Sequence, residues 1–234
     1  MRFFKYTGLG NDFLIFEGKP FDAQTIRELT DRHFGIGADG VLFVDTEDFA
    51  FSIYNADGLR ALMCGNGLRC VAKYLHDARK VKDKEIFEIK SDHALHQCYV
   101  DGNIVSCSLA EPTLIQKDPY VVDAGAKHVV LFEKFDLKKA LKLRKNFNAN
   151  VNFFFENNHI HTFEKGVEAF TLACGTGALS CFFVLNVNAQ EFVMRSKKTL
   201  YIFKEKNVIW MTGECTYICE GTVEKTCLES IFVG

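Results

Sequence analysis

A four-residue motif, Cys-Gly-X-Gly, occurs twice in this chain and constrains its fold more than any other feature. The copies are Cys64–Gly67 and Cys174–Gly177. Each copy follows a few apolar residues and precedes apolar side chains at helical spacing, which predicts a helix that starts at the motif. Each motif therefore predicts a cysteine at a helix N-terminus, where unpaired N–H groups and the helix dipole favour a thiolate and a bound anion.

The spacing of the two motifs indicates an internal duplication. They lie 110 positions apart, from Cys64 to Cys174, which is near half of the 234-residue chain. A second echo relates Gly8–Glu17 to Ala124–Glu133 at a similar offset of 116 positions. We therefore predict two pseudo-symmetric halves. If the halves face each other, their thiols can act on opposite faces of one carbon, and this inverts a stereocentre.

The boundary between the halves is predicted from the prolines. Ala110–Pro119 holds two of the three prolines and is the best candidate for a linker. We place the N-terminal domain at residues 1–113 and the C-terminal domain at 114–225.

The pattern of apolar residues predicts a mixed α/β protein. Asp22 can cap a helix over Asp22–Phe34, with Ile26, Leu29 and Phe34 as a partial apolar stripe. Further helices are expected at Leu137–Leu143 and after both motifs. Strands are expected at Phe3–Tyr6, Phe13–Phe16, Val41–Val44, Phe49–Tyr54, Glu85–Lys90, His96–Val100, Ile104–Leu109, Tyr120–Asp123, Val129–Phe132, Val151–Phe155, His159–Phe163, Leu200–Phe203, Val208–Met211, Cys215–Glu220 and Glu229–Val233.

Composition and charge exclude several classes of partner. Apolar residues make up 48% and charged residues 25%, which is typical of a soluble globular protein. The net charge of −2 argues against nucleic-acid or anionic-membrane binding, and no apolar run approaches a membrane span of about 20 residues. We therefore predict a small-molecule partner.

Nine cysteines in a chain without an export signal predict a reducing cytoplasmic location. Most are expected to be packed thiols. Cys215 and Cys219 lack a second matched pair of ligands, so we predict no metal site.

Gly35–Gly40 matches the spacing of the dinucleotide-binding glycines, but its context is reversed. That fingerprint needs a strand before it and a helix after it. Here the glycines follow the predicted helix and precede a strand. A turn is the better interpretation.

Polar residues near the predicted strand ends are candidates for substrate binding. Asn11 follows a glycine turn, and Asn55 opens a turn nine residues before Cys64. Asn150 and Asn152 place two amides at a strand entrance, and the pair Glu164-Lys165 lies ten residues before Cys174. Taken singly, each is more typical of a turn or a solvated strand end.

Taken together, these motifs resemble those of the diaminopimelate epimerase family, whose members act without a cofactor. The matching segments run in family order and are Gly8–Phe13, Asp31–Gly40, Tyr54–Gly58, Met63–Cys70, Asn150–Phe153 and Thr171–Gly177.

The resemblance implies a fold and a set of roles. It implies two α/β domains, each a mixed sheet curled around a central helix, with the active site in the cleft between them and a C-terminal strand at about 226–234 that returns to the first domain. It also implies LL- and meso-2,6-diaminopimelate as substrates, in lysine and cell-wall precursor biosynthesis, with Cys64 and Cys174 as acid and base assisted by His128 and Glu164. The substrate-binding residues that it implies are Asn11, Asn55, Gly65, Asn66, Asn150, Glu164, Lys165, Gly175 and Thr176. A homodimer is a further expectation.

The chain departs from the family pattern at two positions. Ala126 stands where an asparagine is usual, and Lys165 stands where an arginine is usual. Lysine cannot form the bidentate fork of an arginine with a carboxylate. Both departures affect recognition of the distal end of the substrate.

Two alternatives remain open from the residues. One is a related two-cysteine racemase with a proline-like substrate. The other is a non-enzymatic redox or metal-binding protein that uses its cysteines structurally.

Overall fold

The structure, a computed structural model, describes residues 1–61, 63–92 and 94–224. It divides into two compact units. Unit 1 comprises Met1–Val105 and the chain from Cys215 onward, and unit 2 is Ser106–Glu214. The predicted domain limits at 113 and 225 stay a prediction, and the strands predicted at Glu229–Val233 and at 226–234 lie outside the described residues.

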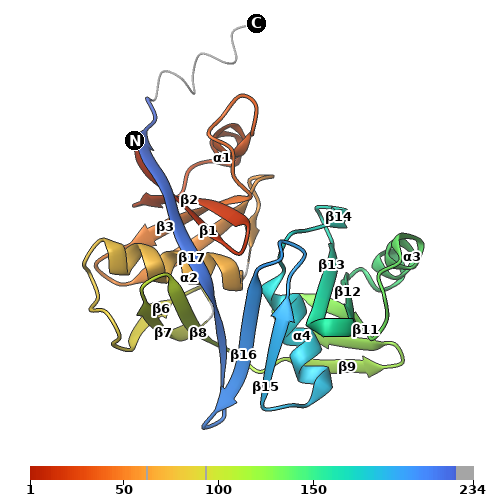
Figure 1. Ribbon diagram of the computed structural model, residues 1–234. Helices are drawn as coiled ribbons and strands as arrows, with labels where there is room; N and C mark the ends of the chain where they lie inside the picture. The colour runs from red at the N-terminus through yellow and green to blue at the C-terminus, as the bar shows by residue number, and fades with distance from the viewer. Residues whose placement is uncertain (62, 93, 225–234) are drawn as a thin grey trace, which may run out of the picture. The chain divides into compact units, whose positions relative to one another are not determined.

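Unit 1 is a mixed sheet with two helices (Figure 1). In chain order its elements are β1 (Arg2–Gly8), β2 (Asn11–Glu17), α1 (Ala23–Thr30), β3 (Gly40–Asp45), β4 (Ala50–Asn55), β5 (Arg60–Ala61), α2 (Gly65–Asp77), β6 (Phe87–Lys90), β7 (Leu95–Asp101) and the start of β8 (Ile104–Leu109). The hairpin β1–β2 is antiparallel, and α1 then crosses over to β3, which pairs with β2 in parallel. The last part of the final strand, β17 (Val208–Thr222), pairs antiparallel with β1.

Unit 2 repeats this order of elements. They are β9 (Thr113–Lys117), β10 (Tyr120–Asp123), β11 (Lys127–Leu131), α3 (Leu137–Phe147), β12 (Asn150–Phe155), a short 3-10 turn (Glu156–Asn158), β13 (His159–Glu164), β14 (Ala169–Phe170), α4 (Gly175–Leu185), β15 (Ala189–Val193), β16 (Thr199–Glu205) and the first part of β17. The hairpin β10–β11 is followed by the crossover α3 and the parallel pair β11–β12, as in unit 1. The predicted duplication is therefore visible in the topology.

The predicted linker was wrong, because Ala110–Pro119 contains β9. This strand pairs with β10 in unit 2, as the end of β17 pairs with β1 in unit 1. Pro112 and Pro119 flank β9 and do not interrupt it, so neither removes a hydrogen bond from the strand interior.

Each unit is built around a buried helix. In α2 every residue from Gly65 to Leu75 is buried, and the helix contacts β1, β2, β3 and β7. Helix α4 contacts β10, β11, β12, β15 and β16. A helix that is buried on all sides must be enclosed by other elements. Each sheet thus curls around its own central helix, as predicted.

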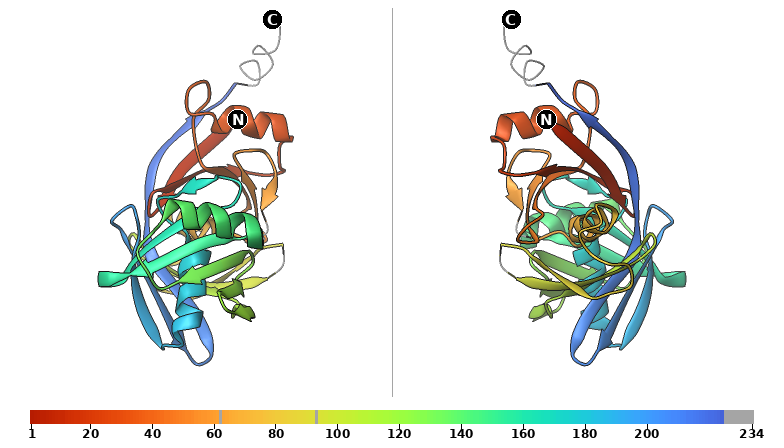
Figure 2. Two further views of the ribbon diagram at one scale, coloured as in Figure 1. Left: turned by 90° about the vertical axis from the view of Figure 1, so that its right-hand side faces the viewer. Right: turned by 90° about the vertical axis from the view of Figure 1, so that its left-hand side faces the viewer.

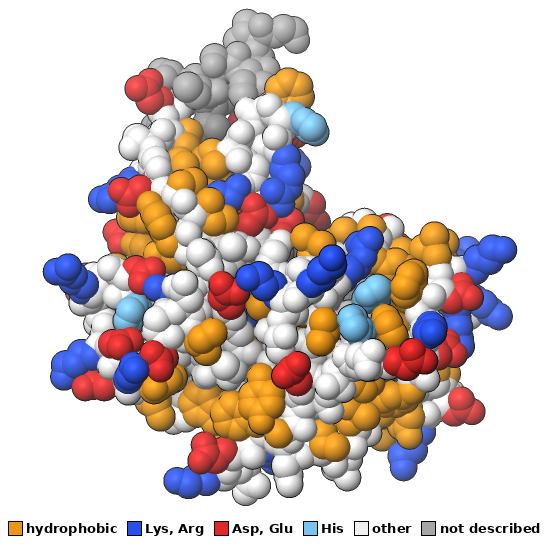
Figure 3. Space-filling view, viewed as in Figure 1, with side chains coloured by type: hydrophobic (Ala, Val, Ile, Leu, Met, Phe, Trp, Pro, Cys, Tyr) orange, Lys and Arg blue, Asp and Glu red, His pale blue; other side chains and the backbone are white. Residues whose placement is uncertain are grey.

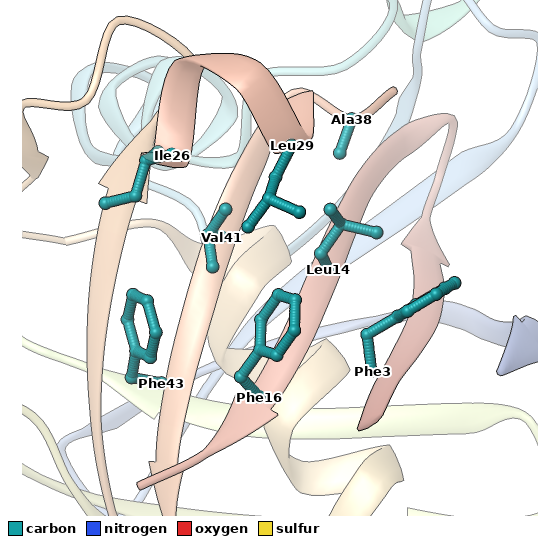
Figure 4. Close-up of a cluster of buried hydrophobic side chains, with 8 residues drawn as sticks. All are labelled: Phe3, Leu14, Phe16, Ile26, Leu29, Ala38, Val41 and Phe43. Carbon is teal, nitrogen blue, oxygen red and sulfur yellow. The ribbon is translucent and has the colours of Figure 1, made fainter. Parts of the chain in front are cut away.

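The crossover helices instead pack on the outer side of each sheet. Helix α1 covers a cluster contributed by β1, β2 and β3, in which Leu29 and Ile26 meet Phe16 and Phe43 (Figure 4). Helix α3 buries only Ala140 of its own residues and lies on the outside of unit 2 (Figure 2). Burying a large apolar side chain stabilises the fold by about 1.5 to 3 kcal/mol, so such clusters hold the crossovers in place.

Helix α1 begins as predicted but ends earlier. The Asp22 carboxylate accepts hydrogen bonds from the backbone N–H groups of Gln24 and Thr25, both at 3.0 Å. The helix stops at Thr30 because the Asp31 carboxylate accepts from the N–H groups of His33 and Phe34, both at 2.7 Å. This local turn competes with further helix. The prediction that Phe34 joins the apolar stripe was wrong, since its side chain is 85% exposed.

The strands predicted at Val208–Met211 and Cys215–Glu220 are one strand, β17. Charged side chains of both signs are interspersed over the face shown in Figure 3, in keeping with the small net charge. In the part of the chain that the structure describes, none of the helices has the length and apolar character needed to span a membrane.

Candidate active site

Cys64 is the N-cap residue of α2, as the sequence predicts. Its backbone is extended, with φ −146° and ψ 112°, and its sulfur accepts a hydrogen bond from the N–H of Gly67 at 3.4 Å. The first N–H groups of a helix have no carbonyl partner within the helix. The N–H groups of Gly65 and Asn66 belong to this turn and suit a carboxylate ligand.

Asn11 lies beside Cys64. It opens β2 after a tight turn in which Leu9 and Gly10 both adopt positive φ. Its Oδ1 is 3.9 Å from the Cys64 sulfur and accepts a hydrogen bond from Nδ2 of Asn66 at 3.2 Å. The structure thus brings together Asn11, Cys64 and Asn66, which the resemblance assigns to the site.

An ion cluster supports Asn11, and sequence reasoning missed it. Nδ2 of Asn11 donates to Asp39 at 2.7 Å. Arg32 donates to Asp39 at 2.8 Å and to both carboxylate oxygens of Asp12 at 2.6 and 3.2 Å. Burial raises the pKa of Asp12, but hydrogen bonds and charges from Arg32 and Lys5 outweigh it and lower the pKa overall. These charged residues come from separate segments of the chain, so no local pattern in the sequence reveals the cluster.

Asn55 ends β4, where it pairs in register with Gly40. Its backbone N–H donates to the carbonyl of Leu59 at 2.9 Å, within the predicted turn. Because Asp39 precedes Gly40, this register places Asn55 and Asp39 at the same end of the neighbouring strands β3 and β4. Its role in substrate binding stays a prediction.

A buried group of polar side chains lies behind Cys64. Arg69 is fully buried, and its Nη2 donates to Oδ1 of Asn66 at 2.6 Å. The thiol of Cys215 hydrogen-bonds with Cys70. Burial raises the pKa of Cys215, but this hydrogen bond and the charge of Arg69 outweigh it and lower the pKa.

Cys215 and Cys219 do not share an environment, although both lie on β17. Cys215 is buried, whereas Cys219 lies in the stretch Tyr217–Glu220, which is exposed on both faces of the strand. Among the described residues, no group of three or more His, Cys, Asp or Glu side chains is arranged to hold a metal ion.

Cys174 occupies the equivalent place in unit 2, as the N-cap of α4. Its sulfur lies 3.5 Å from Oγ1 of Thr176. Burial raises the pKa of the Cys174 thiol, and the negative charge of Glu164 raises it further. The N–H groups of Gly175 and Thr176 lie in the first turn of this helix, like those of Gly65 and Asn66 in unit 1.

Glu164 ends β13 and faces Cys174. Its Oε1 accepts a hydrogen bond from the hydroxyl of Thr171 at 2.5 Å, and its carboxylate also hydrogen-bonds with the Cys174 thiol. Lys165 follows in an exposed turn, and its backbone N–H donates to Oδ1 of Asn150 at 2.8 Å. The predicted Glu164-Lys165 pair therefore connects Asn150 with Cys174.

His128 is fully buried on β11, in register with Asn150 on β12. Nδ2 of Asn152 donates to the carbonyl of Val129 at 2.9 Å and lies 3.1 Å from Nδ1 of His128. Nδ2 of Asn150 lies 3.4 Å from Nε2 of His128, so an amide nitrogen faces each ring nitrogen. Burial lowers the pKa of His128 to about 4. The sequence pointed to both amides at this strand entrance but assigned a role to Asn150 alone; Asn152 lies on the same face of the strand two residues later.

This low pKa predicts a loss of stability in mild acid. In the unfolded chain, His128 becomes protonated as the pH falls below about 6.5. In the folded protein it stays neutral until the pH reaches about 4. Stability contributed by neutral His128 is thus present above pH 6.5 and lost as the pH falls, by up to about 3 kcal/mol. Urea unfolding of wild type and His128→Gln at pH 7 and pH 4.5 measures this. The variant should lose clearly less stability over that interval, and an equal loss would contradict the assignment.

Comparison with known proteins points to one family. A sequence profile of the diaminopimelate epimerase family matches residues 3–115. Diaminopimelate epimerase of Campylobacter lari is 34% identical over 239 residues, covering 92% of this chain and 95% of that protein. The Helicobacter pylori enzyme is 31% identical over 260 residues, covering 93% and 94%.

Solved structures show the same fold at low sequence identity. A probable proline racemase from Agrobacterium radiobacter with bound carbonate has a TM-score of 0.74 at 11% identity, covering 96% of this chain and 93% of its own. A phenazine biosynthesis protein of the PhzF family from Enterococcus faecalis has a TM-score of 0.71 at 11% identity, covering 95% and 98%. These likenesses confirm the fold class.

Proposed function

Because this chain belongs to the diaminopimelate epimerase family, we propose that it is an isomerase that interconverts LL- and meso-2,6-diaminopimelate without a metal or an organic cofactor. One structural observation supports this proposal most strongly. The same unit is built twice, and in each copy a cysteine is the N-cap of the central helix.

The proposed reaction moves two protons. One cysteine acts as a thiolate and removes the α-proton, so that its sulfur becomes a thiol. The other cysteine, a thiol at the start, gives its proton to the opposite face of the same carbon and becomes a thiolate. The two cysteines exchange roles in the reverse reaction. The proposal requires that Cys64 and Cys174 reach one α-carbon in the working enzyme.

Helix N-termini supply the electrostatic stabilisation. Negative charge spreads from the α-carbon onto the α-carboxylate as the proton leaves. We assign the α-carboxylate to N–H groups of Gly65, Asn66, Gly175 and Thr176, which suit an anion because of their place in the first helical turns. We assign the binding of the other polar groups of the substrate to Asn11, Asn55, Asn150 and Lys165.

Glu164 and His128 have different supporting roles in this proposal. Burial raises the pKa of Cys174, so this thiol keeps its proton in the free protein. It must lose the proton when it acts as the base, and the Glu164 carboxylate is hydrogen-bonded to it and can accept the proton. His128 stays neutral near pH 7 and orients the Asn150 region through hydrogen bonds, since it has no charge to contribute.

A second candidate, racemisation of a proline-like substrate, follows from the weakened distal site. Ala126 and Lys165 replace an amide and a guanidinium that the family pattern provides. A substrate without a distal carboxylate would need neither. Against this, the chain presents Asn11, Asn55 and Asn150, which suit a second polar end.

Incubation in deuterated water separates the two candidates. We expect the wild-type protein to convert LL-diaminopimelate to the meso isomer and to place one deuterium at the inverted carbon, as measured by NMR and mass spectrometry. Proline and lysine serve as substrates that lack the distal amino-acid group. Exchange into proline but not into diaminopimelate would support the second candidate, and exchange into neither would contradict both.

We also propose that the protein works in the reducing cytoplasm. Each of the cysteines in the described part of the chain is a free thiol, and a disulfide between Cys64 and Cys174 would consume both the acid and the base. The homodimer stays a prediction.

A further inference from the structure

Three hydrogen bonds between side chains form a chain behind Cys64. Nη2 of Arg69 donates to Oδ1 of Asn66 at 2.6 Å. Nδ2 of Asn66 donates to Oδ1 of Asn11 at 3.2 Å. Nδ2 of Asn11 donates to Oδ2 of Asp39 at 2.7 Å. The chain links the first turns of α2 to the loop before β3.

The two ends of this chain fix its direction. An amide can be turned over so that oxygen and nitrogen exchange places, and its orientation is inferred from its partners. A guanidinium only donates and a carboxylate only accepts. Arg69 at one end therefore requires the oxygen of Asn66, and Asp39 at the other end requires the nitrogen of Asn11. Both amides are oriented in one sense only.

The orientation of the Asn11 amide determines which of its atoms faces the Cys64 sulfur. Oδ1 of Asn11 is the atom turned toward the Cys64 sulfur, at 3.9 Å. An amide oxygen can only accept, so the sulfur beside it must donate an S–H. The sulfur can at the same time accept the N–H of Gly67, at 3.4 Å. A helix N-terminus alone favours a thiolate, so the amide chain opposes the effect of the helix.

We propose that the directed chain from Arg69 through Asn66 and Asn11 to Asp39 keeps Cys64 protonated in the free protein, and that Asp39 is the residue that positions the Asn11 amide. This inference deepens the proposed epimerase function and rests on it for its catalytic meaning. Cys64 is then the acid of the first turnover. Its proton moves to the α-carbon and leaves a thiolate, while Cys174 passes its own proton to Glu164 and takes the α-proton on the other face.

The surroundings support both ends of the chain. Asp39 also accepts the backbone N–H of Asp12 at 3.1 Å and Arg32 at 2.8 Å, which hold its carboxylate toward Asn11. Arg69 is fully buried and hydrogen-bonds with both Asn66 and Cys215, which fixes its guanidinium. The elements around Cys64 carry several charged or titratable groups. They include Lys5 on β1, Asp12 on β2, Arg32 and Asp39 before β3, Arg69, Cys70 and Lys73 on α2, and Cys215 on β17.

Thiol alkylation tests the protonation of Cys64 without any substrate. Iodoacetamide reacts with thiolates, and mass spectrometry of the peptides gives the rate at each cysteine. Cys219 is exposed and serves as the internal reference. We expect the pH of half-maximal alkylation of Cys64 to be equal to or above that of Cys219. A value about one pH unit or more below Cys219 would overturn the proposal.

Two variants of Asp39 test its positioning role. Asp39→Asn and Asp39→Ala remove the same charge, but only asparagine keeps an oxygen that can accept from Asn11. We expect kcat to fall at least about tenfold more in Asp39→Ala than in Asp39→Asn, with KM within about threefold in both. We also expect Cys64 to be alkylated at lower pH in Asp39→Ala, because the Asn11 amide then loses one of the two hydrogen bonds that hold its oxygen toward the sulfur.

The outcomes are separable from failure of the proposed function. Indistinguishable kcat values and alkylation profiles for the two variants, with both folded by thermal unfolding, would overturn the role of Asp39. If the alkylation results hold but no epimerisation of diaminopimelate occurs, the protonation of Cys64 stands and the proposed function fails.

Discussion

Replacing either Cys64 or Cys174 by alanine is expected to lower the rate of epimerisation by at least about 10³-fold. Each substitution removes one of the two proton carriers, and no other side chain replaces it. The measurement is the rate of conversion of LL- to meso-diaminopimelate, with circular dichroism to show that the variants fold. Turnover within tenfold of wild type in either variant would rule out the two-thiol mechanism.

Deuterium exchange makes this test sharper. A variant that retains one thiol can still remove and return a proton on one face without inversion. We expect each single variant to exchange the α-hydrogen of only one of the two isomers, and the two variants to differ in which isomer they exchange. Cys181→Ser is the matched control, because Cys181 is a fully buried thiol on α4. It should change stability and leave the exchange pattern as in wild type.

Gly177→Ala is expected to destabilise unit 2 by about 3 kcal/mol, at the upper end of the range for overpacked cores. An added Cβ would lie 2.2 Å from Oδ1 of Asn152 and 2.8 Å from Oγ1 of Thr162. Asn152 is fully buried and holds both Val129 and His128 through its Nδ2. It cannot retreat without breaking these hydrogen bonds.

The equivalent glycine of the other motif provides the control. A Cβ on Gly67 would lie 3.1 Å from Cδ1 of Ile53 and 3.2 Å from Cδ2 of Leu42, which are the ends of flexible side chains. We expect Gly67→Ala to cost about 1 kcal/mol. Thermal and urea unfolding of both variants gives the comparison. If Gly67→Ala is the more destabilising of the two, the steric account of unit 2 is wrong.

The helix starts were predictable because their causes are local. Asp22 caps α1 through bonds to residues two and three positions later, and both cysteines cap helices within their own motifs. The end of α1 was missed although its cause is also local. The apolar spacing of Ile26, Leu29 and Phe34 favours a longer helix, but the turn that Asp31 forms with His33 and Phe34 ends it.

The strand in the segment Ala110–Pro119 could not be predicted from the residues of the segment alone. Its prolines suggest a linker, and Thr113–Lys117 is exposed along its whole length. Only pairing with β10 makes it a strand. Strand pairing depends on a partner elsewhere in the chain, so the same residues are compatible with either state until the partner is placed.

The sequence by itself determined the duplicated plan, the two cysteines at helix N-termini and the family to which the chain belongs. These follow from repeated motifs and from hydrogen bonds within a few residues. Only the tertiary structure decided what surrounds each thiol. Cys64 meets Asn11, which is 53 positions away in the chain and is oriented by Asp39 and Arg69. The direction of a hydrogen bond depends on which distant group donates, so packing and not the motif decides which atoms face a thiol.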